Sequence, residues 1–303
     1  YLHMFRGLLY GSYQKPKELV WIFGCTIYLA MMAEGFLGYV LPYGQMSYWG
    51  AQVIISLFGA IPYIGESLEL WVRGDYYISG ITVSRFFALH VVALPLVLIA
   101  LVFLHLVALH EVGAGNPEGV DIEEHLDEDG VPLDSVPFFP YKVLNALVAI
   151  GVFMTVFSII MFFFPEGGGY FIEMANFQEA NPLVTPDHIA PVWYYAPFYT
   201  MLRAIPDPLG GLIVMAAAVA IFFIVPWLDR SKVASIRYKG IYSKIAITMF
   251  GVSFLTLGYL GTVGVTEVRK TMSVICTIIY FAYFLLMPIY TKYEITKEVP
   301  ERL

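Results

Sequence analysis

Six long runs of apolar residues constrain the fold of this 303-residue chain more than any other feature. A helix needs about 20 residues to cross a hydrocarbon core of about 30 Å. We therefore predict complete membrane spans at residues 19–41, 85–109, 143–164, 209–228, 244–261 and 272–290. Residues 1–5 resemble the end of a seventh apolar helix, and we expect the native protein to have a preceding N-terminal part. A content of 59% hydrophobic and 14% charged residues agrees with an all-α polytopic protein in a lipid bilayer.

The basic residues indicate an orientation in the membrane. Of the 17 Lys and Arg residues, twelve fall in one alternating set of loops and ends, and five fall in the other. Such an excess marks the cytoplasmic side, which would also hold the C-terminus. The net charge of −7 comes largely from residues 111–134, which contain nine acidic residues. We interpret this stretch as a solvated acidic loop and expect no nucleic-acid partner.

Two long loops, residues 42–84 and 165–208, lie on the less basic side. Both are rich in aromatic residues, Gly and Pro rather than in charge. Apolar loops of this length suggest partly embedded segments that line a cavity. Within the first loop, residues 50–62 and 68–72 are candidates for short surface helices.

Three histidines lie inside apolar segments. His90 and His105 are fifteen residues apart in one predicted helix, and His3 is in another. Fifteen helical residues rise roughly 22 Å and turn about 60° past whole turns, so both imidazoles face roughly the same way. A single membrane histidine is often only an interhelical hydrogen-bonding group. This set favours axial ligation of two stacked hemes, with His3 supplying one of the second imidazoles.

Glycines and arginines support this interpretation. Gly24 and Gly38 are fourteen residues apart in one predicted span, close to one face and at two depths. Glycine allows a flat ligand to approach the backbone, although it also serves ordinary helix packing. Arg6 and Arg85, near span ends, are candidates to pair with heme propionates or to anchor the helices at the interface. The sequence contains no CxxCH motif, so we expect the hemes to be held non-covalently.

Several motifs are more specific. They are RGLLYGSY at residues 6–13, GYVLPYGQMS at 38–47, GAIPYIG at 59–65, RFFALH at 85–90, NPLVTP at 181–186 and LRAIP at 202–206. Together they resemble cytochrome b of ubiquinol–cytochrome c oxidoreductase, respiratory complex III, of the bacterial type. The resemblance implies eight spans in the full protein, of which helix A and most of helix B are missing here. It divides the chain into a heme-binding bundle (residues 1–111), the acidic connecting loop (112–140) and C-terminal helices E to H (141–303) with the quinol-oxidation loop (165–208).

The resemblance also assigns roles. It implies that His3 and His105 bind the high-potential heme near the basic side, with Gly24 close to it. His90 would bind the low-potential heme, near Gly38, with a partner histidine that lies outside this sequence. His110 would contact quinone at the reduction site. The quinol-oxidation pocket would include Tyr39, Gly50, Pro191, Val192, Trp193, Tyr194 and Tyr199, with Arg203 close by.

The chain departs from the family pattern between the histidines. Mitochondrial relatives separate the two helix-D histidines by fourteen positions, whereas His90 and His105 are fifteen apart. The chloroplast relative also has the longer spacing, but its chain splits after helix D and this one continues. We expect Pro95, which lies between the histidines, to absorb the extra residue as a kink.

The oxidation-site motif Pro-Glu-Trp-Tyr is altered to Pro191-Val192-Trp193-Tyr194. Quinol oxidation still releases two protons, and valine cannot accept one. Glu34 lies one turn before Gly38 in a predicted span, 19–41, that is otherwise free of charge. A carboxylate at membrane depth is costly and usually functional, so we hypothesise that Glu34 replaces the lost base. A protonated Glu34 in an interhelical hydrogen bond is the alternative.

The reduction site also departs from the pattern. The family's Lys-Asp pair at the start of helix E aligns with Asn145 and Ala146, with Lys142 three residues earlier. Taken together, the resemblance implies a Q-cycle subunit that oxidises ubiquinol, with two b-type hemes, a Rieske iron–sulfur protein, a cytochrome c-type subunit and a homodimeric assembly in the bacterial inner membrane. The alternatives are the same scaffold oxidising menaquinol and a non-redox proton-coupled transporter.

Overall fold

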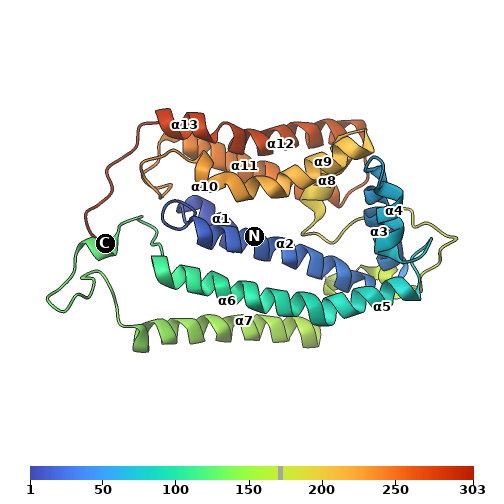
Figure 1. Ribbon diagram of the computed structural model, residues 1–303, viewed down its shortest axis with the longest axis horizontal. Helices are drawn as coiled ribbons and strands as arrows, with labels where there is room; N and C mark the ends of the chain where they lie inside the picture. Colours follow the sequence, from blue (N-terminus) through green and yellow to red (C-terminus); the bar gives the residue numbers. More distant parts are fainter. Residues whose placement is uncertain (170–172) are drawn as a thin grey trace.

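The computed structural model describes residues 1–169 and 173–303 as a set of helices joined by turns and long loops. In these two described ranges, six helical segments are long and apolar enough to cross a membrane, and each overlaps a predicted span. Figure 1 shows them lying side by side along the long axis of the molecule. The six segments are Glu18–Val40, Gly80–Val112, Phe138–Phe163, Pro208–Leu228, Ile241–Gly261 and Glu267–Leu285.

The N-terminal half begins with α1 (Leu2–Leu9) and the long α2 (Glu18–Val40). Ser79 caps the next membrane helix, because its side chain accepts a hydrogen bond from Ile81 N while Thr82 reaches back to Ser79 N. The remaining elements of this half are α3 (Gln45–Ser56), η1 (Leu57–Ala60), α4 (Gly65–Arg73), α5 (Gly80–Ala88), the π-turn η2 (Leu89–Ala93), α6 (Leu94–Val112) and η3 (Ile122–Glu124).

The C-terminal half contains the other four spans. Its elements are the π-turn η4 (Phe138–Lys142), α7 (Val143–Phe163), η5 (Gly167–Gly169), η6 (Met174–Phe177), α8 (Ala196–Ala204), α9 (Pro208–Ala220), η7 (Ile221–Ile224), α10 (Val225–Leu228), α11 (Ile241–Gly261), α12 (Glu267–Leu285) and α13 (Met287–Tyr293). The predicted limits of the last span, 272–290, were wrong at both ends. Thr266 caps α12 by accepting from Arg269 N. The helix stops at Leu285 because Pro288 cannot donate to the carbonyl four residues earlier.

The main core joins both halves of the chain. Aromatic side chains from α11 and α12 stack at its centre, with the Phe250 and Tyr283 rings 4.6 Å apart. Trp21 of α2 reaches the same core and donates its indole N–H to the Phe222 carbonyl at 2.7 Å. A second, smaller core lies where the end of α2 meets α3 and α5. These two cores fix α2 between the C-terminal helices and the helix formed by α5 and α6.

The two long loops predicted from composition lie against each other. Gln45, the first residue of α3, donates through Nε2 to the Val184 carbonyl and accepts from Asn181 N, each at 2.7 Å. Ser47 N donates to Asn176 Oδ1 at 2.7 Å. The expected short helices in the first loop are α3 with η1 and, further along, α4. Loop 165–208 is therefore held over α3 by hydrogen bonds to one buried glutamine and its neighbours.

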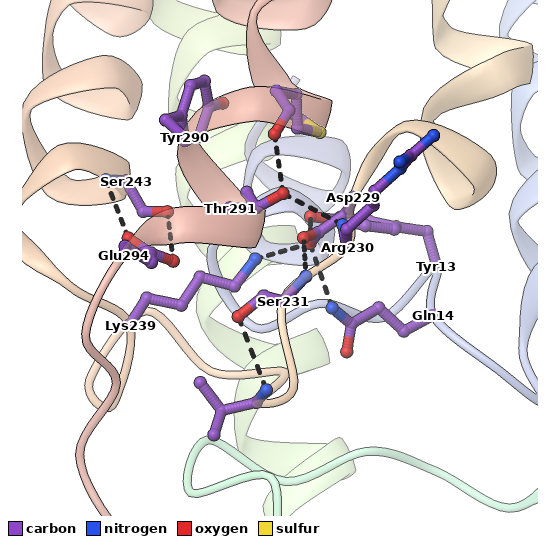
Figure 2. Close-up of polar contacts among 12 residues, drawn as sticks. Tyr13, Gln14, Asp229, Arg230, Ser231, Lys239, Ser243, Tyr290, Thr291 and Glu294 are labelled. Carbon is purple, nitrogen blue, oxygen red and sulfur yellow. Dashed lines mark hydrogen bonds and ion pairs between the residues drawn. The ribbon is translucent and has the colours of Figure 1, made fainter.

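A polar cluster ties the opposite end of the bundle together, as Figure 2 shows. The Asp229 carboxylate is fully buried and pairs with the Lys239 ammonium. It also accepts from Tyr13 Oη at 2.7 Å and Gln14 Nε2 at 3.0 Å. Burial alone would raise the pKa of Asp229, but the Lys239 charge and the hydrogen bonds from Lys239, Ser231 N and Tyr13 together outweigh it and hold the pKa below its usual value. The cluster joins the turn before α2 to the segment after α10.

Further contacts gather the more basic loops at this same end. Arg237 forms an ion pair with Glu118 in the connecting loop, and Arg302 pairs with Asp134 at 2.9 Å. By contrast, α7 contributes no buried residue to the described part of the chain. In Figure 1 α7 lies on the outside of the array, next to α6. The alternation of loops between two ends is the arrangement that the charge pattern predicts.

Candidate functional site

His90 and His105 lie on one continuous helical segment, Gly80–Val112. His90 is inside the π-turn Leu89–Ala93, where Leu94 N donates to the Leu89 carbonyl five residues earlier. A π-turn holds one more residue than an α-helical turn. The extra residue between the histidines is thus accommodated directly before Pro95, close to where the sequence predicts a kink.

Each of these histidines faces a glycine of α2, which packs against α6. A Cβ on Gly38 would overlap the His90 ring, and a Cβ on Gly24 would lie 3.4 Å from His105 Cε1. The predicted correspondence of two histidines with two glycines at two depths is therefore present. At each level the α2 residue that faces the histidine ring is thus a glycine, which has no side chain.

The ring nitrogens of the two histidines differ in their partners. His90 Nδ1 lies 3.0 Å from the backbone carbonyl oxygen of Glu34 and 3.0 Å from its carboxylate Oε1. The His105 ring approaches the Val20 backbone, but its Nδ1 has no hydrogen bond of normal geometry among the described residues. The sequence did not reveal the contact between Glu34 and His90. The available signal was the four-residue spacing of Glu34 and Gly38, which places both on one helix face.

The other predicted cofactor residues are exposed. His3 and Arg6 lie on α1, and the Arg6 guanidinium is 5.6 Å from the Tyr10 ring centre. Arg85 of α5 donates to the Trp71 carbonyl at 2.9 Å. Within the part of the chain described, neither arginine forms an ion pair. Both guanidinium groups therefore retain donors for an acidic group.

The altered oxidation-site motif packs on α2 beside Glu34. Tyr195 Oη donates to the Met32 carbonyl at 2.5 Å. Gly35, which follows Glu34, faces Tyr194 Oη, and a Cβ there would lie 3.3 Å from that oxygen. The Glu34 carboxylate itself is turned toward His90. Burial raises the pKa of Tyr194, which keeps its phenol neutral and able to donate a hydrogen bond.

The rest of the predicted oxidation pocket surrounds this contact loosely. Pro191 and Val192 are partly buried, whereas Trp193 is 63% exposed and meets Tyr194 edge-on. Tyr199 Oη donates to the Ile189 carbonyl at 3.4 Å, and the Arg203 guanidinium lies 4.4 Å from the Tyr199 ring centre.

Two further residues predicted for the oxidation pocket are Tyr39, near the end of α2, and Gly50, in the first long loop. The Tyr39 carbonyl accepts from Ser47 Oγ at 2.5 Å, which ties the end of α2 to α3. Gly50 lies in α3, and no atom comes within 4 Å of a Cβ built on it. The Gly50 face of α3 is thus open.

The residues expected at the reduction site lie at the basic end. His110 is exposed in the last turn of α6, before Gly113 ends the helix with a φ of 71°. Lys142 is the last residue of the π-turn η4, and Asn145 and Ala146 lie in the first turn of α7, which begins at Val143. All three are exposed.

These observations define a class of protein: a multi-pass helical membrane protein that presents histidines and glycines in matched pairs at two depths. Comparison with known proteins identifies the family. Residues 1–197 match the family described as cytochrome b (N-terminal)/b6/petB, and residues 179–281 match cytochrome b (C-terminal)/b6/petD.

The chain belongs to the cytochrome b family. It is 55% identical to cytochrome b of Allochromatium vinosum over all of this chain and 75% of that protein. It is 46% identical to cytochrome b of Rickettsia bellii over all of this chain and 73% of that protein. A solved structure of a hyperthermophilic respiratory complex III superposes with a TM-score of 0.89 at 34% identity, covering 97% of this chain and 75% of that one.

Cytochrome b is the electron-transfer subunit of respiratory complex III that carries out the Q cycle, and its family binds b hemes. The proton-coupled transporter considered from the histidines and Glu34 is therefore excluded. The chain is a multi-pass membrane protein of a bacterial respiratory chain and part of complex III with other subunits.

Proposed function

We propose that this chain oxidises quinol where α3 and loop 165–208 meet, and reduces quinone at the opposite, basic end. The observation that carries the proposal is the pairing of His90 with Gly38 and of His105 with Gly24. At each of two depths between the oxidation end and the basic end, the Gly80–Val112 helix thereby offers a histidine ligand. At the same depths, α2 offers a glycine backbone. One electron of each quinol goes to a Rieske iron–sulfur protein, and the other crosses the bilayer to quinone.

The residues present fit two non-covalent b-type hemes. Each histidine faces a glycine, which carries no side chain that a flat ring would have to displace, and His105 Nδ1 has no hydrogen-bond partner among the described residues. His3 and His105 would hold the high-potential heme, and His90 the low-potential heme together with a histidine outside this sequence. Arg6 and Arg85 would hold propionates. When bound, the hemes supply one-electron redox chemistry across the membrane.

At the oxidation end, the chain itself must bind quinol and accept protons. Tyr194 supplies a neutral phenol donor, and Pro191, Val192 and Trp193 would form an apolar wall of the quinol pocket. Tyr39, Gly50 and Tyr199 would complete it. Val192 cannot take up a proton, and Glu34 is the nearest acid along α2, one residue from the Gly35–Tyr194 contact. Glu34 would therefore serve as the proton acceptor, with Asp187 and His188 as further candidates.

At the basic end, His110 would contact the quinone that is reduced. Its exposure in the last turn of α6 leaves the imidazole free to donate to a quinone oxygen. Asn145 and Ala146 cannot deliver protons, so Lys142 and the acidic connecting loop would do so.

The finer assignment of partners and place follows the family. We expect a Rieske protein, a cytochrome c-type subunit and a second copy of this chain, in the bacterial inner membrane with the C-terminus in the cytoplasm. A Bradyrhizobium diazoefficiens relative named cytochrome b/c1, 42% identical over all of this chain, supports the cytochrome c-type partner. Ubiquinol is the expected substrate, and a menaquinol is the alternative that the altered motif favours.

The first test is a reduced-minus-oxidised difference spectrum of the purified complex, with heme counted per cytochrome b chain. We expect two b-type hemes. His90→Leu should remove the low-potential heme alone, and His105→Leu the high-potential heme alone. A complex without heme, or variants that keep both hemes, would contradict the ligand assignment. Turnover with ubiquinol and menaquinol analogues, measured as cytochrome c reduction, decides between the substrates.

A further inference from the structure

The Glu34 side chain contacts the histidine proposed to bind the low-potential heme. Its Oε1 and its own backbone oxygen each lie 3.0 Å from His90 Nδ1. The side chains of Glu34 and His90 are 17% and 31% exposed, so the contact is largely removed from solvent. An imidazole Nδ1 carries at most one hydrogen, so the two oxygens compete for it or share it.

The Glu34 backbone carbonyl alone could accept the hydrogen of His90 Nδ1. The Glu34 carboxylate is therefore a second acceptor, which this hydrogen bond does not require. At the other level Val20 occupies the equivalent position, four residues before Gly24, as Glu34 is four residues before Gly38. Val20 has no polar side chain, and the His105 ring approaches the Val20 backbone without a hydrogen bond of normal geometry from Nδ1 among the described residues. The two levels thus share one backbone arrangement and differ by one carboxyl group.

No Lys or Arg side chain in the described residues pairs with Glu34. Its second oxygen, Oε2, is buried and has no hydrogen-bond partner among those residues. A carboxyl group at membrane depth is costly and is usually paired with another polar group. Among the described residues, the His90 ring is therefore the one polar side chain that the Glu34 carboxyl group contacts.

We propose that Glu34 is a positioning residue for His90, which fixes the ring through Nδ1 and lowers the reduction potential of the low-potential heme. An Nδ1–H held by a carboxylate leaves Nε2 without a proton and directed away from Glu34, as an axial ligand requires. A carboxylate beside an axial imidazole also stabilises the oxidised iron, because it makes the ligand more electron-rich. This inference rests on the proposed heme ligation by His90.

The test is an equilibrium redox titration of the intact complex, followed by heme absorbance in the absence of quinol. Glu34→Gln should raise the midpoint potential of the low-potential heme and leave that of the high-potential heme unchanged. Glu34→Asp, which keeps the carboxylate, should shift it less. Glu18→Gln is the matched control: the same change on the same helix, about 24 Å away along its axis. It should shift neither heme.

Each outcome decides. An unmoved low-potential midpoint in Glu34→Gln, with both hemes present, would overturn this inference and leave the heme assignment intact. Equal shifts of both hemes would also overturn it, because the effect would not act through His90. Selective loss of the low-potential heme would support the positioning role. Loss of both hemes would contradict it, since Glu34 would then be needed for the whole fold. A wild-type complex without heme would refute the proposed function itself.

Discussion

The levels of His90 and His105 are built on the same backbone arrangement and differ in chemistry. On α2 the pairs Val20–Gly24 and Glu34–Gly38 repeat after fourteen residues. On the facing helix the histidines are fifteen apart, and the π-turn at Leu89–Ala93 compensates for the extra residue. The repeated glycines position both histidine rings, whereas the side chain four residues before each glycine sets the polarity around the ring. The position of each ring and its chemical environment thus depend on different residues of α2.

The largest expected effect comes from deletions that test the π-turn. Deleting Val92 should convert the π-turn into a regular turn and retain both hemes. Deleting Val102, in the regular part of α6, should rotate His105 by about 100° relative to α2 and remove the high-potential heme. The heme count per chain measures both. Equal heme loss in the two deletions would show that the π-turn does not absorb the extra residue.

The Asp229 cluster should stabilise the level of His105 more than that of His90. Gly24 is near the start of α2, the end that Tyr13 and Asp229 hold. Asp229→Ala leaves the buried Lys239 ammonium unpaired, which should cost about 3–5 kcal/mol. Thermal unfolding of the purified complex measures the loss, and the high-potential heme should dissociate first. Asp134→Ala, which removes the exposed ion pair with Arg302, is the control, and we expect it to change the unfolding temperature little.

The same cluster predicts a dependence on pH. The folded-state pKa of Asp229 lies below its ordinary value of 3.8. Its stabilising contribution is therefore complete above that value and is lost as the pH falls through the folded-state pKa. Wild type and Asp229→Ala should thus approach each other in unfolding temperature only in strong acid. A difference that vanishes already near neutral pH would contradict this account.

The smallest effect is expected from replacing either Gly38 or Gly24 by alanine. In Gly38→Ala the new Cβ overlaps the His90 ring, and overpacking of this kind costs about 1–3 kcal/mol. In Gly24→Ala the Cβ meets His105 at an ordinary contact distance of 3.4 Å. The gain in helix propensity from glycine to alanine, up to about 1 kcal/mol, should offset much of the cost there. We expect Gly38→Ala to lower the unfolding temperature more than Gly24→Ala does. Equal decreases in the two variants would contradict this prediction.

Much of this arrangement was predictable from the sequence because membrane helices have a strict length and a regular period. The six spans, the facing of His90 and His105 by glycines of α2, and the short helices of the first long loop all follow from those two rules. The end of α12 was missed because apolar composition continues past Pro288, and only the backbone chemistry of proline marks the break.

Two features could not be predicted because they depend on contacts between distant segments. The direction of the Glu34 side chain depends on where the π-turn puts His90. The Asp229 cluster joins residues more than 200 positions apart in the chain, and no local pattern links Tyr13 to Asp229. The hypothesis that Glu34 replaces the lost proton acceptor remains a prediction.

The π-turn has a consequence for speed as well as for geometry. Electron tunnelling between two sites slows exponentially with the gap between them. In a regular helix an added residue would lengthen the path by about 1.5 Å and turn one ligand aside by about 100°. By widening a single turn at Leu89–Ala93, the chain takes up that residue locally. The distance between the two ligand levels, and the electron-transfer rate that depends on it, are thereby kept unchanged when one residue is added between the histidines.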